Sequence, residues 1–529
     1  MSERRRDVSL ATIGDLYDRA VLHGGARTAI ADGARRFSYA ELGANALKIA
    51  GALQALGVGR AQRVAFLMVN CAEYVFCEYA VAKTGAARVP LAVLLGDDDL
   101  VYILNFSRCD VLIYHAKFAD RLRQIRPQLD FIKTFICVGA QGAPAVDGDL
   151  TLEALLMQPT PPCAPCPIDP EDIAGIYFTG GTTGRPKGVM LSHRSWYYTY
   201  YAEMLEFGIA DGEAFVFVTP MTHASGCLIL PVLLRQGCCI ILDRFDPDLL
   251  LDTIQKHRAT ATLLVPTMIY VLLDHAGRGA YDLSSLKNVL YGASAIAPER
   301  LKQALASFGP IFTQFFGQTE APMVLTALSR QAHVDAAFAQ DDVLMSAGRT
   351  AYQVSLRLVD DDGRDVARGD AGEVVVRSLN MMSGYLDNSE ATAAAIRDGW
   401  LYTGDIARIS NQGLVTIIDR KKDMIVSGGL NVYPREVEDA LFEHPAVKHA
   451  AVVGAPHEKW GEEVRAIVVL HDGAQVGAAE LIEFVKVRKG SVAAPKAIEF
   501  WEAIPLTNLG KIDKKAIRAR FWRGQERMV

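Results

Sequence analysis

Hydrophobic and polar positions follow two different periods along this chain. Short, almost continuously apolar runs such as VLIYHA (111–116) and AFVFVTP (214–220) predict buried strands. Longer amphipathic stretches such as PDLLLDTIQKHRA (247–259) and APERLKQALASFG (297–309) predict helices between them. The strand pattern recurs at TFICVGA (134–140), CCIILD (238–243), ATLLVPT (261–267) and NVLYGAS (288–294). Buried strands that alternate with helices indicate layered α/β sheets whose strands run largely parallel.

The pattern changes after about residue 350. VSLRLVDDDGRDV (354–366) and GEVVVRS (372–378) alternate more strictly around a DDG turn, which predicts antiparallel strands. We therefore expect a multi-layer α/β fold. A large N-terminal domain (1–420) would contain two α/β sheet subdomains and a small β-barrel-like region, followed by a small α+β C-terminal domain (421–529). The charged cluster DRKKD (419–423) marks the expected boundary.

Composition and charge exclude several classes of protein. Half of the 529 residues are hydrophobic (50%) and the formal net charge is -6, without a basic patch that would indicate nucleic-acid binding. No apolar run approaches the roughly 18–20 residues that span a bilayer, so we expect no transmembrane segment. The N-terminus lacks a hydrophobic signal region, and nine cysteines are an odd number. Both features favour the reducing cytoplasm. Cys163 and Cys166 lie in a proline-rich stretch and indicate a linker rather than a metal site.

A glycine-rich loop supplies the first chemical signal. The stretch YFTGGTTGRPKGVMLSH (177–193) directly follows an apolar run. Glycines let backbone N–H groups approach an anion closely, and threonine hydroxyls and Lys187 add donors and charge. The loop is not a Walker A motif, because Lys187 is followed by Gly188 instead of serine or threonine. The stretch therefore predicts a different kind of phosphate-binding loop.

In its wider context this loop resembles the signature of the adenylate-forming superfamily, usually T-S-G-T-T-G-x-P-K-G. Gly180 stands in place of the serine. Other segments resemble the family's motifs in the same order: PMTHASG (220–226), YGASAIAPE (291–299), QFFGQTEAP (314–322), GWLYTGD (399–405), DRKKDMIVSGGLNVYPREVE (419–438) and PLTNLGKIDKKAIR (505–518). The resemblance covers roughly residues 10–520. It implies an AMP-forming acyl-CoA synthetase that uses ATP, Mg²⁺ and coenzyme A.

The resemblance also implies roles for individual residues. Glu320 would hold magnesium and Thr319 would donate to the α-phosphate, whereas Asp405 and Arg420 would contact the ribose. The expected ATP-binding residues are Thr179, Gly180, Gly181, Thr182, Thr183, Gly184, Lys187, Gly292, Ala293, Ser294, Phe315, Phe316, Gly317, Gln318, Asp405 and Arg420. The glycine-rich loop would clamp the β- and γ-phosphates.

The remaining implied roles concern the acid, coenzyme A and the small domain. Lys511 would act as a point charge on the carboxylate and α-phosphate during adenylation. Lys422 occupies the hinge position, and Gly428 and Gly429 would leave room for the pantetheine arm. The expected acyl pocket comprises His223, Ala224, Ser225, Cys227, Tyr291 and Met323, with His223 beside the reacting acyl group.

The resemblance implies a two-step ligase whose small, mobile C-terminal domain rotates between acyl-AMP formation and thioester formation. The pocket positions are mostly apolar or small, which favours a medium- or long-chain fatty acid or an alicyclic acid. An aromatic acid, cinnamate-like or benzoate-like, and transfer of the acyl group to a carrier protein remain alternatives. A scaffold without activity is disfavoured, because a pure binder needs no mobile lysine. A homodimer is the assembly we expect.

Overall fold

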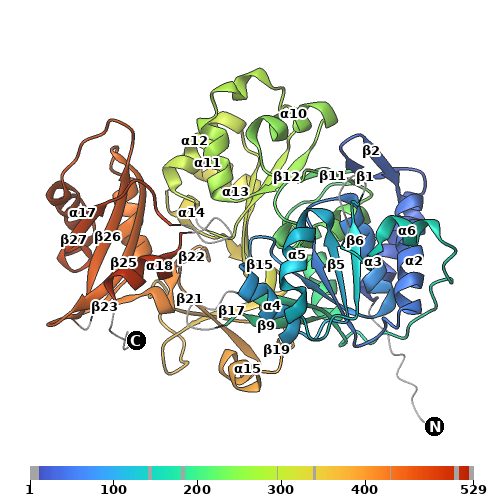
Figure 1. The fold of residues 1–529 in the computed structure, drawn as a ribbon. Coiled ribbons are helices and arrows are strands. Elements are labelled where there is room, and N and C mark those ends of the chain that lie inside the picture. Colours follow the sequence, from blue (N-terminus) through green and yellow to red (C-terminus); the bar gives the residue numbers. More distant parts are fainter. Residues whose placement is uncertain are drawn as a thin grey trace, which may run out of the picture.

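The computed structural model describes residues 11–140, 146–179, 185–294, 296–337, 341–428, 430–505 and 512–522. Figure 1 shows the C-terminal strands at one end of the molecule and the N-terminal helices α2 and α3 at the other. Two large mixed sheets, a smaller antiparallel sheet and a C-terminal sheet account for the described strands. The large α/β region and the small α+β region expected from the sequence are thus confirmed.

The first large sheet has nine described strands in the order β16-β15-β14-β13-β12-β10-β11-β1-β2. Its strands are β1 (Thr28–Asp32), β2 (Arg35–Ser38), β10 (Ala214–Phe217), β11 (Cys238–Ile241), β12 (Ala261–Leu264), β13 (Asn288–Tyr291), β14 (Phe312–Gln318), β15 (Ala321–Leu328) and β16 (Arg349–Thr350). The strands from β14 to β1 run parallel, as the buried apolar runs predict. The helices in this part of the chain are α8 (Ala224–Cys227), α9 (Ile229–Leu234), α10 (Pro247–His257), α11 (Pro266–Asp274), α12 (Pro298–Phe308), α13 (Arg330–Ala337) and α14 (Asp341–Met345).

The second large sheet has eight described strands in the order β19-β9-β8-β4-β3-β5-β6-β7. They are β3 (Arg63–Leu67), β4 (Ala87–Pro90), β5 (Val111–His115), β6 (Thr134–Val138), β7 (Leu150–Thr151), β8 (Ile173–Thr179), β9 (Lys187–Ser192) and β19 (Gly384–Tyr385). The helices of this region are α1 (Ile13–Gly24), α2 (Tyr39–Ala55), α3 (Ala72–Thr84), α4 (Asp97–Phe106), α5 (Ala119–Ile125), α6 (Leu152–Met157) and α7 (His193–Glu206). The antiparallel pair β8–β9 flanks the glycine-rich loop.

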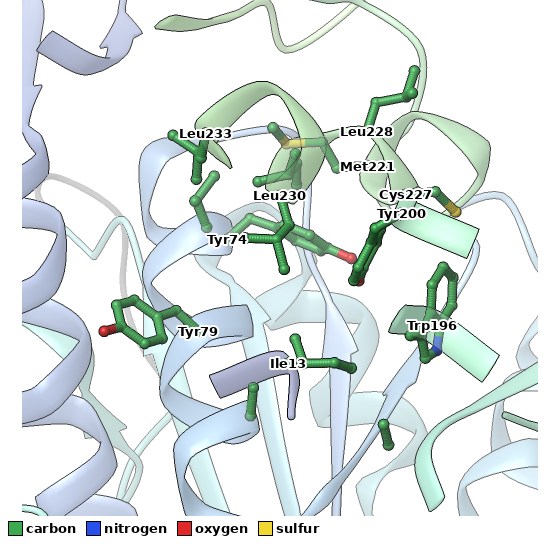
Figure 2. Close-up of a cluster of buried hydrophobic side chains, with 14 of the residues drawn as sticks. Ile13, Tyr74, Tyr79, Trp196, Tyr200, Met221, Cys227, Leu228, Leu230 and Leu233 are labelled. Atoms are coloured by element: carbon green, nitrogen blue, oxygen red, sulfur yellow. The ribbon is translucent and has the colours of Figure 1, made fainter. Parts of the chain in front are cut away.

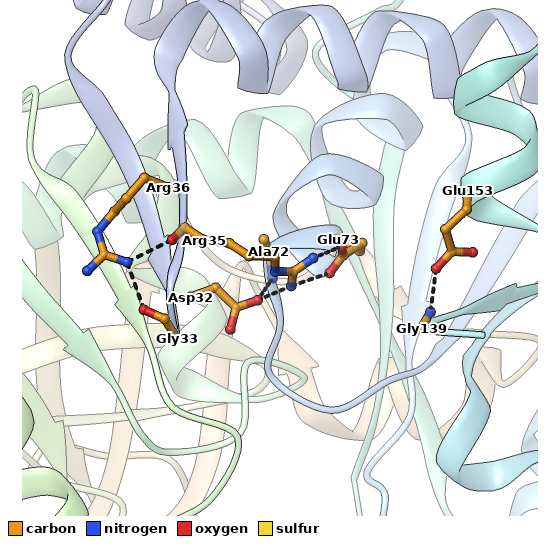
Figure 3. A network of polar contacts seen from close by, with 8 residues as sticks. All are labelled: Asp32, Gly33, Arg35, Arg36, Ala72, Glu73, Gly139 and Glu153. Atoms are coloured by element: carbon orange, nitrogen blue, oxygen red, sulfur yellow. Dashed lines mark hydrogen bonds and ion pairs between the residues drawn. The ribbon is translucent and has the colours of Figure 1, made fainter. Parts of the chain in front are cut away.

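A polar contact joins the two large sheets at the start of α3 (Figure 3). The first helical residue, Ala72, donates its N–H to Asp32 of β1 at 3.1 Å, and the preceding residue, Cys71, gives no side-chain cap. Arg35 of β2 pairs with both Asp32 and Glu73. Because helix N-termini attract negative charge, Asp32 supplies the missing cap from the neighbouring sheet.

A shared hydrophobic core holds the sheets together. Figure 2 shows side chains from α1, α3, α7, α8 and α9 packed against one another, among them Ile13, Tyr74, Trp196, Tyr200 and Cys227. The proline-rich linker crosses α2, where Gln54 donates to the carbonyl of Ala164 at 2.9 Å and accepts its N–H at 2.8 Å. Among the described helices, none is long and apolar enough to cross a membrane.

The chain after β16 forms two antiparallel-rich units. The first contains β17 (Val354–Val359), β18 (Gly372–Ser378), α15 (Ser389–Ala395), β20 (Ile396–Arg397), β21 (Trp400–Ile409) and β22 (Val415–Arg420). The C-terminal unit contains β23 (Ile425–Ser427), β24 (Leu430–Val432), α16 (Pro434–Phe442), β25 (Val447–His457), β26 (Gly461–Leu470), α17 (Ala478–Ala493), β27 (Ala497–Phe500) and α18 (Lys514–Phe521). It has its own hydrophobic core between α16, α17 and the sheet, as an α+β unit requires.

Candidate active site

The ends of the glycine-rich loop are fixed by β8 and β9. Thr179 and Lys187 face each other as the last and first residues of the antiparallel pair. The predicted residues Gly180, Gly181, Thr182, Thr183 and Gly184 lie outside the described residues. The ammonium group of Lys187 lies 5.0 Å from the ring centroid of Tyr385. The loop therefore ends beside β19, which pairs with β9.

Glu320 lies in the same place, between β14 and β15. The hydroxyl of Tyr385 donates to Oε1 of Glu320 at 2.9 Å, and the N–H of Met382 donates to the Glu320 carbonyl at 2.8 Å. Burial, reinforced by the Glu320 carboxylate, raises the pKa of Tyr385, so its hydroxyl stays protonated. The sequence predicted Glu320 but missed Tyr385, because its contact joins residues far apart in the chain.

The carboxylate of Glu320 fits a magnesium ion. Mg²⁺ is usually bound by one or two carboxylates together with substrate phosphates and water. No group of three or more His, Cys, Asp or Glu side chains that could hold a metal by itself occurs among the described residues. A single carboxylate next to a phosphate loop is therefore the donor set that a magnesium–nucleotide complex requires. The described residues do not form a cage that would hold a metal ion with protein ligands alone.

Strained backbone surrounds this carboxylate. Ala293 after β13 and Met323 in β15 both have positive φ angles, 66° and 62°. A side chain on Gly317 would lie 2.6 Å from the backbone of Met323, and one on Gly292 would lie 2.6 Å from the carbonyl of Phe315. Non-glycine residues with positive φ are uncommon and cluster at functional sites. The turn after β13 and the β14–β15 bulge therefore approach each other too closely for larger residues.

The other predicted residues of this region follow the same strands. Phe315, Phe316 and Gln318 lie on β14, and Thr319 joins β14 to β15 ahead of Glu320. Ser294 follows Ala293 after β13. The ring of Phe315 is buried against Phe207, with 5.1 Å between the centroids.

A second acidic residue lies on β21, opposite β22. Asp405 and Arg420 are direct partners in the antiparallel register, and the Arg420 Nε lies 2.7 Å from Oδ1 of Asp405. Asp405 is buried, whereas Arg420 is partly exposed. The N–H of Asp405 donates to the hydroxyl of Thr403, which in turn donates to the Val374 carbonyl. The pair presents a fixed carboxylate and a fixed cation side by side.

The charged segment after β22 is tied to α18. Lys422 lies in a short 3-10 helix, Lys421–Asp423, and burial lowers its pKa. Arg518 of α18 pairs with Asp423 at 2.6 Å, and Lys514 pairs with Glu438 of α16 at 2.9 Å. These contacts hold the start of the C-terminal unit against its last helix.

The predicted lysine and one predicted glycine of the C-terminal unit, Lys511 and Gly429, lie outside the described residues. The N–H of Asp513 donates to the Pro505 carbonyl at 2.8 Å, which closes the base of the segment that contains Lys511. Gly428 has a positive φ of 59° and donates to the Trp460 carbonyl at 2.9 Å. A tight turn of this kind favours glycine.

The segment around His223 is held by a residue that the sequence did not single out. Asn70 donates to the Thr219 carbonyl at 3.0 Å and accepts the Met221 N–H at 2.8 Å. Ala224, Ser225 and Cys227 form the short helix α8 directly after His223. A side chain on Gly226 would lie 2.0 Å from the Met221 carbonyl. The hydrogen bonds of Asn70 thus hold the segment in place, and its close packing leaves no room for a side chain at position 226.

Tyr291 is buried at the end of β13. Its hydroxyl lies 2.8 Å from Nε2 of His333 and 3.2 Å from Oε1 of Gln314. The Nδ1 of His333 lies 2.8 Å from the Ser329 carbonyl and must donate to it, so Nε2 accepts from Tyr291. Burial lowers the pKa of His333 to about 4, which keeps the ring neutral.

Comparisons with known proteins show the family to which the chain belongs. Residues 17–386 match the family described as AMP-binding enzyme, and residues 436–511 match the AMP-binding enzyme C-terminal domain. The chain is 41% identical to the medium/long-chain-fatty-acid–CoA ligase FadD8 of Mycobacterium tuberculosis, over 90% of this chain and 84% of the relative. It is 35% identical to a feruloyl-CoA synthase of Amycolatopsis, over 93% of this chain and 96% of the relative.

Solved structures show the same fold. The amide bond synthetase McbA from Marinactinospora thermotolerans superimposes with a TM-score of 0.87 and 30% identity, over 96% of this chain and 99% of that one. ATP-bound MatB from Rhodopseudomonas palustris gives a TM-score of 0.85 at 27% identity, over 96% and 99% of the two chains. The chain therefore belongs to the AMP-binding enzyme family, within the adenylate-forming superfamily that contains the acyl-CoA synthetases.

Proposed function

We propose that this enzyme joins an apolar medium- or long-chain fatty acid, or an alicyclic acid, to coenzyme A. In the first step a carboxylate oxygen of the acid attacks the α-phosphorus of ATP, and the bond to the leaving pyrophosphate breaks. In the second step the thiolate of coenzyme A attacks the acyl carbonyl carbon, and AMP leaves. The observation that carries this proposal is the meeting of Glu320, Tyr385 and Lys187 beside the glycine-rich loop.

Charge explains why these groups lie together. The acid and ATP are both anions, so the protein must position them and neutralise charge as the new bond forms. Glu320 would hold magnesium, and the Tyr385 hydroxyl would orient its carboxylate from the far side. When bound, Mg²⁺ supplies positive charge to the phosphate oxygens. Lys187 adds a second cation, and Thr319 would donate to the α-phosphate.

Asp405 and Arg420 suit the ribose end of the nucleotide. A buried carboxylate accepts two hydrogen bonds from a diol, and Arg420 holds that carboxylate in place at 2.7 Å. The turn of Gly292, Ala293 and Ser294 and the adjoining strand β14 would flank the adenine. This assignment follows the order of the family's motifs and the narrow space around Gly292.

The C-terminal unit would supply residues to each of the two half-reactions in turn. Lys511 would contact the carboxylate and α-phosphate during adenylation, and Gly428 and Gly429 would line the path of the pantetheine arm afterwards. Rotation about Lys422, between domains 1–420 and 421–529, would exchange the two faces. The ion pairs of Asp423 and Glu438 with α18 support movement of this unit as one body.

The acid is inferred from the segment around His223. His223, Ala224, Ser225, Cys227, Tyr291 and Met323 would form the pocket, and they are mostly apolar or small. The name of the relative that is 41% identical favours a fatty acid. An aromatic acid is the second candidate, because a relative that is 35% identical is a feruloyl-CoA synthase.

AMP formation from ATP, measured with and without coenzyme A over a panel of acids, tests the proposal. The panel runs from acetate to palmitate and includes benzoate, cinnamate and cyclohexanecarboxylate. We expect AMP and acyl-CoA with medium or long apolar acids. Turnover of the aromatic acids alone would favour the second candidate, and product only with a carrier protein would favour acyl transfer to that carrier. No AMP with any acid would contradict the proposal.

We also propose that the enzyme works in the cytoplasm as a homodimer. All nine cysteines are free, which suits a reducing compartment. Light scattering of the purified protein tests the dimer, and fractionation of producing cells tests the location. A monomer at micromolar concentration, or recovery outside the cytoplasm, would contradict the respective statement.

A further inference from the structure

A buried carboxyl group lies near the acid-binding segment and takes part in none of the contacts described so far. Glu203 lies on α7 and is 0% exposed. Among the described residues, neither of its carboxyl oxygens has a hydrogen-bond partner. Burial of an unpaired polar group is costly, and buried polar groups nearly always have partners. The position of Glu203 therefore requires a reason.

The helix directs Glu203 toward the interior. Residues three or four apart share one face of a helix, which places Glu203 with Trp196, Tyr200 and Phe207. Each of these three neighbours is 1% exposed. Phe207, which caps α7, packs on Phe315 of β14. Glu203 thus lies on the face of α7 that leads to the strand carrying the predicted nucleotide and acid residues.

The short helix α8 contributes Cys227 to the same buried cluster as Trp196 and Tyr200. Cys227 lies beside Tyr200 in Figure 2. Burial, followed by the Glu203 carboxyl, raises the pKa of the Cys227 thiol, which places the two side chains near each other. Ser225, on the same short helix, has a buried hydroxyl that also has no hydrogen-bond partner among the described residues. Helices α7 and α8 thus each carry a buried side chain whose oxygen atoms have no hydrogen-bond partner among the described residues.

No ion pair among the described residues accounts for Glu203. The buried cation Arg88, which donates to Tyr200 of the same helix at 3.4 Å, pairs with Glu78 and donates to the hydroxyl of Tyr177 at 2.5 Å. Burial raises the pKa of Glu203 well above its usual range, which favours the neutral carboxylic acid. In that form it can both donate and accept a hydrogen bond.

We infer that Glu203 is a specificity-determining residue of the acid pocket and selects acids whose apolar body carries a hydroxyl or oxo group away from the carboxylate. This inference rests on the proposed function, because it takes the segment from His223 to Cys227 as the pocket wall. A hydroxyl or oxo oxygen pairs with the Glu203 carboxyl, whereas a wholly apolar acid leaves that carboxyl buried and unpaired.

Pairs of acids matched in length test the inference in the intact enzyme. Decanoate is compared with 10-hydroxydecanoate and 9-oxodecanoate, and cinnamate with 4-hydroxycinnamate, by kcat/KM for acid-dependent AMP formation. We expect the wild type to favour the oxygenated member of at least one pair by about 10-fold or more. Glu203→Met should remove this advantage and keep turnover of the apolar member. Glu203→Gln, which still donates and accepts, should retain most of it.

Glu206→Leu is the matched control, because Glu206 lies on the same helix and accepts the N–H of the exposed Tyr352 at 3.0 Å. It should leave every ratio unchanged. The inference is overturned if the wild type prefers the apolar member of every pair, if Glu203→Met keeps the advantage, or if it slows both members equally. Turnover of the apolar acids by the wild type reports the proposed function separately. Melting temperatures show whether each variant is folded.

Discussion

The nucleotide side and the acid side of the candidate site hold their polar groups in different ways. On the nucleotide side Asp405 is paired with Arg420, and Glu320 accepts from Tyr385. On the acid side the buried groups of Glu203 and Ser225 have no hydrogen-bond partner among the described residues. Paired groups are preorganised for one ligand, and unpaired groups are completed by the ligand itself. The contrast indicates that the paired groups serve the reaction itself, whereas the unpaired groups select the acid.

The largest expected effect comes from Lys511→Ala. Removal of the point charge should reduce acid-dependent AMP formation by about 10²–10³-fold or more. Supplied acyl-AMP should still be converted to the thioester, because the second step uses the other face of the C-terminal unit. The matched control is Lys515→Ala on α18. If both half-reactions fell equally in a folded variant, the assignment of two conformations would be wrong.

Glu320→Gln should be the next most damaging change. We expect a loss of about 100-fold in kcat for AMP formation, because the carboxylate that would hold magnesium is neutralised. Tyr385→Phe removes only the hydrogen bond to Glu320, and we expect a loss of about 10-fold. The comparison predicts that both variants slow every acid by the same factor. Steady-state rates with a fatty acid and an aromatic acid test this prediction. A changed ranking of the acids would contradict the comparison between the two sides.

Cys227→Phe sharpens the comparison from the acid side. A larger ring on α8 should lower kcat/KM for the longest acids by about 10-fold or more, relative to short ones. The KM for ATP should stay within about two-fold, because Cys227 is far from the Asp405–Arg420 pair in the order of the motifs. Cys238→Phe, a similar change on β11, is the control. A raised KM for ATP with an unchanged acid profile would contradict the separation of the two sides.

The smallest expected effect is a pH dependence of stability at His333. Its folded pKa is about 4, below the value of about 6.5 in an unfolded chain. The unfolded chain therefore binds the proton more readily between these values, and stability is lost as the pH falls from 6.5 toward 4. His333→Gln should reduce the fall in melting temperature between pH 7 and pH 5 by about 2–4 °C. An unchanged fall would contradict the neutral buried ring.

The sheets were predictable because their signals are local. Strands such as β12 (Ala261–Leu264) and β13 (Asn288–Tyr291) lie within short apolar runs that are typical of buried strands, and α10 (Pro247–His257) has a complete amphipathic pattern. The predicted runs were longer than the strands, and two of them, AFVFVTP and NVLYGAS, continue beyond β10 and β13 into the segments PMTHASG and YGASAIAPE. The order of strands depends on contacts between distant segments, which a single sequence does not specify.

The site was predictable only in part. Glu320, Asp405 and Arg420 belong to extended motifs, and the structure brings Asp405 and Arg420 together. Tyr385 and Asn70 were missed, because their partners lie more than 20 residues away in the chain. Glu203 was missed, because its burial is visible only in the folded chain. Nothing in the residues flanking Glu203 distinguishes it from the exposed Glu residues of an ordinary helix. Burial in three dimensions is the signal that identifies it.

The transfer of oxygen from the acid to AMP tests the central claim most directly. The acid is labelled with oxygen-18 in its carboxylate, and AMP is isolated after turnover with ATP, Mg²⁺ and coenzyme A. Attack of the carboxylate on the α-phosphorus predicts one labelled oxygen in the phosphate of AMP. Unlabelled AMP, or label in inorganic phosphate with ADP as the nucleotide product, would contradict an acyl-adenylate and with it the proposed function.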